Sequence, residues 1–255
     1  TTATPNSDVG TYTITPSGAT ALNYDITFVP GTLTIDAALL TITATDFART
    51  YGDPNPAFTA SFAGLVADDT AADITGLVFT TPATTASNVG TYAITPSGAS
   101  NANYTITHTA GTLTVDPATL AIELDDQSRT YGDANPALTS TISGFKLSDD
   151  ASVLTGLAPT TPATSASNVG DYAITTGTVS ATNYTVTVTD GTLTVDPASL
   201  TITADDLAKT FGSANPTLTT TDSGYKLTDD ASVLTGLTVV TIAAVNSDVG
   251  SYTIT

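Results

Sequence analysis

The sequence predicts a mostly β protein made of tandem, elongated β-sheet domains with an 80-residue period. Thr supplies 58 of the 255 residues, and β-branched side chains favour extended backbone. Apolar and polar residues alternate with the period of a strand, as in residues 40–44. The motif Val-Gly-x-Tyr recurs 80 residues apart, with its glycine at Gly10, Gly90, Gly170 and Gly250.

The repeats divide the chain into two partial and two complete units. We expect a partial repeat at 1–36, repeat domains at 37–116 and 117–196, and a second partial repeat at 197–255. The first piece corresponds to the end of a repeat and the last piece to its beginning. We therefore expect this sequence to be a window on a longer repetitive polypeptide.

Six strands are expected in the second repeat. They are predicted at 40–44, 57–62, 77–81, 92–95, 104–107 and 112–115, of which 40–44 alternates apolar and polar residues and 77–81 is ended by Pro82. Pro96-Ser-Gly98 predicts a turn after the fourth strand. Ala110-Gly111 predicts a hairpin between the last two.

One segment departs from the strand pattern. Residues 148–154, and their copy at 228–234, predict a short capped helical turn with acids at its positive end. Two strands, a short helix and further strands are the order of a β-grasp, so we expect a β-grasp-like fold. The alternative is an immunoglobulin-like β-sandwich, because Asp8-Val-Gly-Thr-Tyr12 and Asp248-Val-Gly-Ser-Tyr252 resemble the tyrosine corner of that fold.

The connections between repeats are short. Residues 115–120 and 195–200 each pass from the last strand of one repeat to the first strand of the next. Pro117 and Pro197 fix one φ angle in each connection. We therefore expect stiff joints and a rod of end-to-end domains.

Composition excludes several classes of protein. A formal charge of −19, with five cationic residues, argues against a nucleic-acid partner. The absence of Cys excludes disulfides, thiolate metal sites and a Cys nucleophile. The sequence contains no apolar run long enough to insert into a membrane.

A second motif recurs once per repeat. It reads Arg-Thr-Tyr-Gly-Asp-x-Asn-Pro at 49–56 and 129–136, and Lys-Thr-Phe-Gly-Ser-Ala-Asn-Pro at 209–216. With Val-Gly-x-Tyr and Gly-Thr-Leu-Thr, it resembles the MBG/YDG-type tandem repeats of large bacterial surface adhesins, including filamentous-haemagglutinin-like secreted proteins. The resemblance implies an extracellular or cell-surface stalk or filament and carries over no catalytic residue.

We expect the residues of this second motif to be structural. Its cation should bond to a neighbouring carboxylate or carbonyl while its stem packs on the aromatic ring. Because the aromatic residue is Phe in the last copy, the ring rather than the hydroxyl is expected to matter. The motif residues are Arg49, Tyr51, Gly52, Arg129, Tyr131, Gly132, Lys209, Phe211 and Gly212.

Acidic residues near the joints are weak candidates for Ca²⁺ ligands. Ca²⁺ takes six to eight oxygens and tolerates irregular geometry. The competing interpretation is that these aspartates shape turns and provide a solvated negative surface. The candidates are Asp116, Asp125, Asp126, Asp196, Asp205 and Asp206.

No pattern indicates an enzyme. His108, the one His, is replaced by Phe28 and Val188 in the sister repeats, so a repeated Ser-His-Asp site is not expected. Glu123 is the one Glu and is replaced by Thr43 and Thr203.

The sequence therefore predicts a non-enzymatic stalk or filament segment of a large extracellular bacterial repeat protein. The expected partners are neighbouring repeats of the same chain or identical chains in a filament. The alternative is an adhesive binding module for a glycan or a surface receptor. No cofactor, nucleic-acid partner or membrane insertion is expected.

Overall fold

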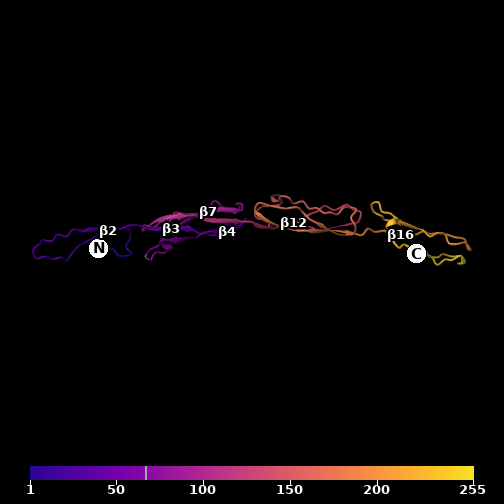
Figure 1. Ribbon diagram of the computed structural model, residues 1–255, viewed down its shortest axis with the longest axis horizontal. Helices are drawn as coiled ribbons and strands as arrows, with labels where there is room; N and C mark the ends of the chain where they lie inside the picture. The colour runs from indigo at the N-terminus through magenta and orange to yellow at the C-terminus, as the bar shows by residue number, and fades with distance from the viewer. Residues whose placement is uncertain (67) are drawn as a thin grey trace. The chain divides into compact units, whose positions relative to one another are not determined.

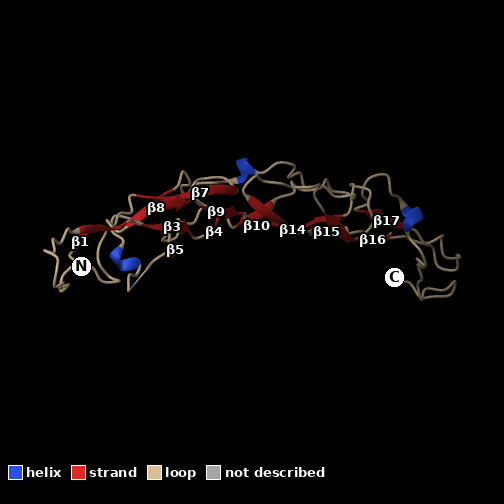
Figure 2. Cartoon of the chain, turned by 60° about the vertical axis from the view of Figure 1, so that its left-hand side comes forward, coloured by secondary structure: helices blue, strands red, loops and turns tan. Residues whose placement is uncertain are grey.

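The computed structural model describes residues 1–66 and 68–255 (Figure 1). Strands dominate, and the three short helices shown in blue in Figure 2 are each a single 3₁₀ turn. The chain forms two compact units. One comprises residues 1–120, 144–153 and 180–185, and the other comprises residues 121–143, 154–179 and 186–255. The prediction of tandem, mostly β repeats is confirmed.

The second repeat contains two small sheets. One has the strand order β5-β3-β8 and the other has the order β4-β9-β7-β6. Alternating residues of β9 are buried because successive side chains of a strand point to opposite faces. The strands are β3 (Ala38–Ala44), β4 (Phe47–Thr50), β5 (Ala60–Ala63), β6 (Val78–Thr80), β7 (Gly90–Ser97), β8 (Tyr104–Thr109) and β9 (Gly111–Asp116).

Both sheets of the second repeat mix parallel and antiparallel pairs. β3 lies parallel to β8, with Ala38 opposite Tyr104, and antiparallel to β5. β9 lies parallel to β4 and antiparallel to β7. The two sheets of an immunoglobulin-like sandwich are antiparallel, so this pairing favours the β-grasp-like interpretation over its alternative.

The predicted hairpin at Ala110-Gly111 is wrong. β8 and β9 do not pair with each other but belong to different sheets. One residue, Ala110, separates them, whereas the common hairpin loops have two residues or more. The chain therefore continues forward into the second sheet. Gly111 lies against Ala44, whose carbonyl oxygen would be 2.5 Å from a Cβ at that position.

The predicted turn at 96–98 begins later than expected. β7 runs through Ser97 because Pro96 faces Phe79 of the edge strand β6. Proline is tolerated where no ladder hydrogen bond needs its nitrogen. The chain turns at Gly98, which has a φ of 74°.

The third repeat repeats the arrangement. β11 lies parallel to β15 and β15 antiparallel to β13, as for β4, β9 and β7. Its strands are β10 (Ala118–Leu124), β11 (Gln127–Thr130), β12 (Ser140–Ser143), β13 (Gly170–Ile174), β14 (Tyr184–Thr189) and β15 (Gly191–Asp196). The partial repeats contain β1 (Gly10–Ile14) paired with β2 (Gly31–Ile35), and β16 (Thr201–Ala204) paired with β17 (Thr220–Ser223).

The predicted helical turn is present but shorter than expected. It is η2 (Ala151–Val153), with counterparts η1 (Ala71–Asp73) and η3 (Ala231–Val233). Asp150 Oδ1 accepts a hydrogen bond of 2.8 Å from the Ser152 amide, as expected for an acidic cap. Among the described residues no helix is long and apolar enough to cross a membrane.

The tyrosine corner is present in all four repeats. The hydroxyl of Tyr12 donates to the carbonyl oxygen of Asp8 at 2.8 Å, and the hydroxyls of Tyr92, Tyr172 and Tyr252 bond in the same way four residues upstream. This local feature of the immunoglobulin-like fold therefore occurs within sheets of mixed pairing.

Each complete repeat encloses small cores. In the second repeat one cluster is formed by Leu40, Ile42, Ile74 and Tyr104 and another by Ala44, Ala83, Ile94 and Leu113. In the third repeat one cluster is formed by Ile122, Leu124, Ala163, Ile174 and Leu193. Burying a Leu or Ile side chain contributes about 1.5–3 kcal/mol.

Candidate interface between successive repeats

The Arg-Thr-Tyr-Gly-Asp-x-Asn-Pro motif forms a buried hydrogen-bond network. Arg49 is 7% exposed, and its guanidinium has no carboxylate partner among the described residues. Its Nε donates to Asn55 Oδ1 at 2.8 Å, and its terminal nitrogens donate to the carbonyl oxygens of Thr50 and Thr84. Asn55 Nδ2 donates to the Ala83 carbonyl at 2.8 Å. The motif thus ties β4 to the loop before β7.

The same network recurs in the other copies. Arg129 donates to Asn135 Oδ1 at 2.7 Å and to the carbonyls of Thr130 and Thr164. In the fourth repeat Lys209 Nζ donates to the carbonyls of Ser213 and Ala244 instead. Of the two expected kinds of acceptor, carboxylate or carbonyl, the cation bonds to carbonyls in all three copies. Packing of its stem on the aromatic ring stays a prediction.

The tyrosine of the motif reaches into the next repeat. Tyr51 is 5% exposed, and its ring lies edge-on to the ring of Tyr184 with centroids 5.6 Å apart. Its hydroxyl donates to Asp149 Oδ2 at 3.1 Å, and the Tyr184 hydroxyl donates to the same oxygen at 2.6 Å. The hydroxyl of Tyr51 therefore also bonds across the joint, and the expectation that the ring rather than the hydroxyl matters stays a prediction for Tyr51→Phe to test.

The next two residues of the motif contact Lys146. Gly52 has a φ of 84°, and a Cβ there would lie 2.7 Å from the Lys146 Cβ, so no other residue fits against this stem. Asp53 Oδ1 lies 3.0 Å from Lys146 Nζ, and the two side chains are 43% and 39% exposed. The Tyr-Gly-Asp sequence of the second repeat thus forms one continuous contact surface with the third.

A second contact joins the same two repeats through Asn183. Its Oδ1 accepts a hydrogen bond of 3.0 Å from the Val89 amide, and its Nδ2 donates to Asn88 Oδ1 at 2.9 Å. Its backbone carbonyl accepts from the Ala118 amide at 3.0 Å. Asn183 therefore connects the loop before β7 with the start of β10.

The joint between the third and fourth repeats uses part of the same set of residues. Lys226 Nζ lies 3.0 Å from Asp133 Oδ1, and a Cβ at Gly132 would lie 2.6 Å from the Lys226 Cβ. Asp229 accepts a hydrogen bond from Tyr131 and thereby raises the pKa of that phenol. The contact of Tyr-Gly-Asp with a lysine and an aspartate therefore recurs 80 residues later, whereas residues 197–255 contain no counterpart of Tyr184 or Asn183.

The joint between the first and second repeats differs in part. Asn103 Oδ1 accepts from the Val9 amide at 2.9 Å, and Asn103 Nδ2 donates to Asp8 Oδ1 at 2.8 Å, as Asn183 does one period later. Val66 occupies the position equivalent to Lys146. No ion pair is therefore available from that side of the joint.

Burial and Asp149 together disfavour ionisation of the interface phenols. Burial, followed by the hydrogen bond to Asp149, raises the pKa of Tyr184 to about 12. The same two causes, in the same order, raise the pKa of Tyr51. Both hydroxyls therefore remain donors at neutral pH.

Three of the six calcium candidates use their carboxylates in hydrogen bonds within the protein. Asp125 and Asp205 accept from threonine hydroxyls, and Asp126 accepts from the Thr192 amide. The backbone carbonyls of Asp116 and Asp196 accept from the amides of Tyr51 and Tyr131. Within residues 1–66 and 68–255 no three acidic or His side chains converge as a metal site. Calcium binding, which also included Asp206, stays a prediction that melting with and without chelator would check.

Sequence reasoning missed several interface residues. Lys146, Asp149 and Asn183 were not assigned to the joint, although Lys146 and Lys226 recur 80 residues apart, as do Asp53 and Asp133. The lysine and the aspartate recur with the same period, and this paired recurrence of opposite charges could have indicated an ion pair between repeats. His108 and Glu123 are exposed strand residues outside the interface.

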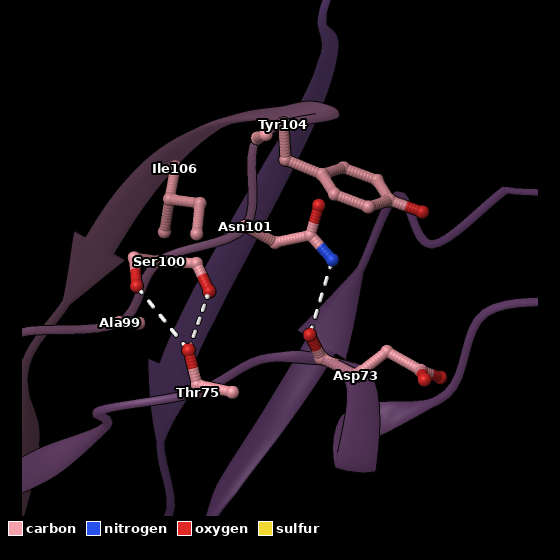
Figure 3. A pocket seen from close by; sticks show the side chains of 8 residues that line it. Asp73, Thr75, Ala99, Ser100, Asn101, Tyr104 and Ile106 are labelled. Atoms are coloured by element: carbon pink, nitrogen blue, oxygen red, sulfur yellow. Dashed lines mark hydrogen bonds between the residues drawn. The ribbon is translucent and has the colours of Figure 1, made fainter. Parts of the chain in front are cut away.

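A shallow pocket of about 700 Å³ lies in the second repeat (Figure 3). Asn101 Nδ2 donates to the Asp73 carbonyl at 3.0 Å across it, and Thr75 Oγ1 bonds to Ser100. The equivalents of Asp73 and Asn101 in the third repeat are Val153 and Ala181. The pocket is therefore a polar feature of one repeat, whereas the interface recurs.

Comparison with known proteins gives one match. The family model described as "MBG domain (YGX type)" matches residues 1–34, 40–114, 120–194 and 200–255. No curated protein matches, and no solved structure matches. The four matches follow the 80-residue period of the sequence.

Proposed function

The chain belongs to the family of MBG domains of the YGX type, and on that premise we propose that it is a structural segment of an extracellular repeat protein. In this role the repeats act as spacers that form a stalk or filament at the cell surface. The chain performs no catalysis in this proposal. Neighbouring repeats are its principal partners.

The recurrence of the inter-repeat interface supports this proposal. Tyr51, Gly52 and Asp53 contact the third repeat through the same kinds of atoms that Tyr131, Gly132 and Asp133 use to contact the fourth. A buried aromatic contact with paired hydroxyls restricts rotation about a joint more than a linker alone would. Stiff joints are what a spacer requires.

The charge of the chain supports the same role. A formal charge of −19 is spread over all four repeats, and like charges keep neighbouring molecules apart in solution. The one His is exposed and lacks a His counterpart in the sister repeats. Both features suit a spacer better than an active site.

Small-angle scattering tests the spacer role. We expect chains with more repeats to show a maximum dimension that increases linearly with repeat number. Replacing Tyr51 and Tyr131 by Ala should broaden the distance distribution, whereas replacing the exposed Thr105 by Ala should not. A distribution in the parent chain that is already compact or freely jointed, or one unchanged by the two tyrosine substitutions, contradicts the proposal.

The second candidate function is an adhesive module for a glycan or a surface protein. The pocket of Figure 3 favours it, because it gathers Asp73, Asn101 and Tyr104 in a repeat-specific place. Asn101 Nδ2 already donates to the Asp73 carbonyl and the Tyr104 hydroxyl to Asp69, which argues against an open ligand site. Glycan-array binding that is lost in Asn101→Ala would support this function, and absence of binding by the parent chain would reject it.

A further inference from the structure

The three joints between repeats carry two kinds of residue pair. After the second and third repeats an aspartate faces a lysine, at 3.0 Å in both joints. After the first repeat a different pair is formed, in which Asn6 Nδ2 donates to Asp68 Oδ2 at 3.4 Å. Val66, 49% exposed, replaces the lysine there. We call the joints with the Asp–Lys pair the charged kind and the joint with the Asn–Asp pair the amide kind.

The residues of the amide kind change together. Asn6 is replaced by Ala86 and Ala166 in the second and third repeats. Its acceptor Asp68 is replaced by Ser148 and Thr228 in the repeats that follow these two. Each joint thus has either both partners of the amide pair or neither of them.

The fourth repeat presents an outgoing face of the amide kind. Asn246 stands at the position of Asn6, so an amide donor is available. Ser213 stands at the position of Asp53, so the acceptor of the lysine ion pair is missing. Phe211, 62% exposed, replaces Tyr51 and offers an apolar ring without a hydroxyl.

We propose that Phe211, Ser213 and Asn246 form a docking surface for a repeat of the second repeat's kind, with Val at the position of Val66 and Asp at that of Asp68. This inference rests on the proposed spacer function. Val66 would lie against Gly212, as the stem of Lys146 lies against Gly52, which buries apolar surface, and Asp68 would accept from Asn246. A lysine at the same place would lie against Gly212 and face Ser213 without a carboxylate, as Lys146 lies against Gly52 and faces Asp53, which disfavours the wrong repeat.

Two extended chains test this preference. Both contain residues 1–255 followed by residues 16–36, which complete the fourth repeat because position 255 is equivalent to position 15. One then continues with residues 37–116 and the other with residues 117–196. The two chains differ only in the repeat that is offered to the docking surface.

Hydrogen exchange of the Val249 amide reports docking. At the existing joints the equivalent amides of Val9 and Val89 bond to Asn103 and Asn183 at 2.9 and 3.0 Å, and both added repeats supply this asparagine. We expect Val249 to exchange about 5-fold more slowly in the chain that ends with residues 37–116. Equal exchange in the two chains, or slower exchange with residues 117–196, would falsify the inference.

Ser213→Asp provides the matched control. It restores the acceptor for the lysine, so Val249 should become more protected in the chain ending with residues 117–196 and gain nothing in the other chain. An unchanged rate in both chains contradicts the charge argument. The Val9 and Val89 amides of the same molecules test the proposed function separately. If those two amides exchange freely, the proposed function fails; if they are protected and only Val249 gives the unexpected result, the docking preference alone fails.

Discussion

The second and fourth repeats share a sequence pattern but differ in burial. Leu40 and Ile42 are fully buried in the second repeat, whereas Ile202, the equivalent of Ile42, is 38% exposed in the fourth. Tyr51 is 5% exposed, and its counterpart Phe211 is 62% exposed. Ile202 is more exposed because residues 197–255 contain no counterpart of β8 or β9. Phe211 is more exposed because the sequence contains no residue that would cover it as Tyr184 of the next repeat covers Tyr51.

The hydrogen-bonded turn of the motif forms in both repeats nonetheless. Asn215 Nδ2 donates to the Ala243 carbonyl at 2.7 Å, as Asn55 does to the Ala83 carbonyl at 2.8 Å. This comparison teaches that the motif organises its own turn, while the core requires the long-range pairing of β9. Substitutions in the core should therefore reduce stability most, and substitutions of surface charges should reduce it least.

Leu193→Ala should have the largest effect. Leu193 is fully buried in β15, and removing a buried Leu side chain costs about 2–5 kcal/mol. Leu33→Ala, at the equivalent position of the partial first repeat, should lower the free energy of unfolding far less, because Leu33 is 38% exposed. Chemical denaturation of both variants measures the difference, and equal losses would contradict the role assigned to burial.

Arg129→Ala should come next. The substitution leaves Asn135 and the carbonyls of Thr130 and Thr164 without their donor, and unsatisfied buried polar groups cost about 1–3 kcal/mol each. Lys209→Ala is the matched control and should cost less, because the fourth repeat is more exposed. The free energies of unfolding decide the order, and a larger loss for Lys209→Ala would reverse the comparison.

Tyr51→Phe isolates the hydroxyl of the joint. We expect a loss of about 1 kcal/mol, since Asp149 then keeps only the Tyr184 donor of the pair. Phe211→Tyr should change stability little, because that ring is largely exposed. Melting of both variants tests this, and an unchanged melt for Tyr51→Phe would mean that the ring alone matters.

Alkaline pH should weaken the joint between the second and third repeats. The pKa of Tyr184 is raised to about 12 from its usual value of 10.0, so the stability that its protonated hydroxyl contributes is complete below pH 10 and is lost as the pH rises through 12. Tyr184→Phe should show a smaller loss over that interval. Denaturation between pH 9 and pH 12 measures it, and identical curves would exclude Tyr184 as the titrating group.

The ion pair should contribute least. Asp53 and Lys146 are 43% and 39% exposed, and exposed pairs contribute about 0.2–1 kcal/mol. Asp53→Ala should therefore reduce stability slightly, and salt should remove the difference from the parent chain. A loss of stability that persists in high salt would mean that Asp53→Ala disturbs the packing of the Lys146 stem against Gly52 rather than an attraction between charges.

Much of the candidate interface could have been predicted from the sequence, but not its pairing. Arg49, Tyr51 and Gly52 stand out because their motif recurs, and a neighbouring carboxylate or carbonyl was expected as the partner of its cation. Asp149 and Asn183 are separated from this motif by about one period or more, so nothing local connects them to it. Contacts between residues so distant in sequence depend on how the strands are arranged.

The sequence by itself determined the 80-residue repeat, the strand-rich composition and the local turns, because alternation, capping and Tyr-to-backbone bonds act within a few residues. Only the tertiary structure decided that Ala110 carries the chain from one sheet to the other and that β3 pairs in parallel with β8. It also decided which tyrosines meet across a joint. These outcomes depend on long-range strand pairing and burial, which a local pattern does not encode.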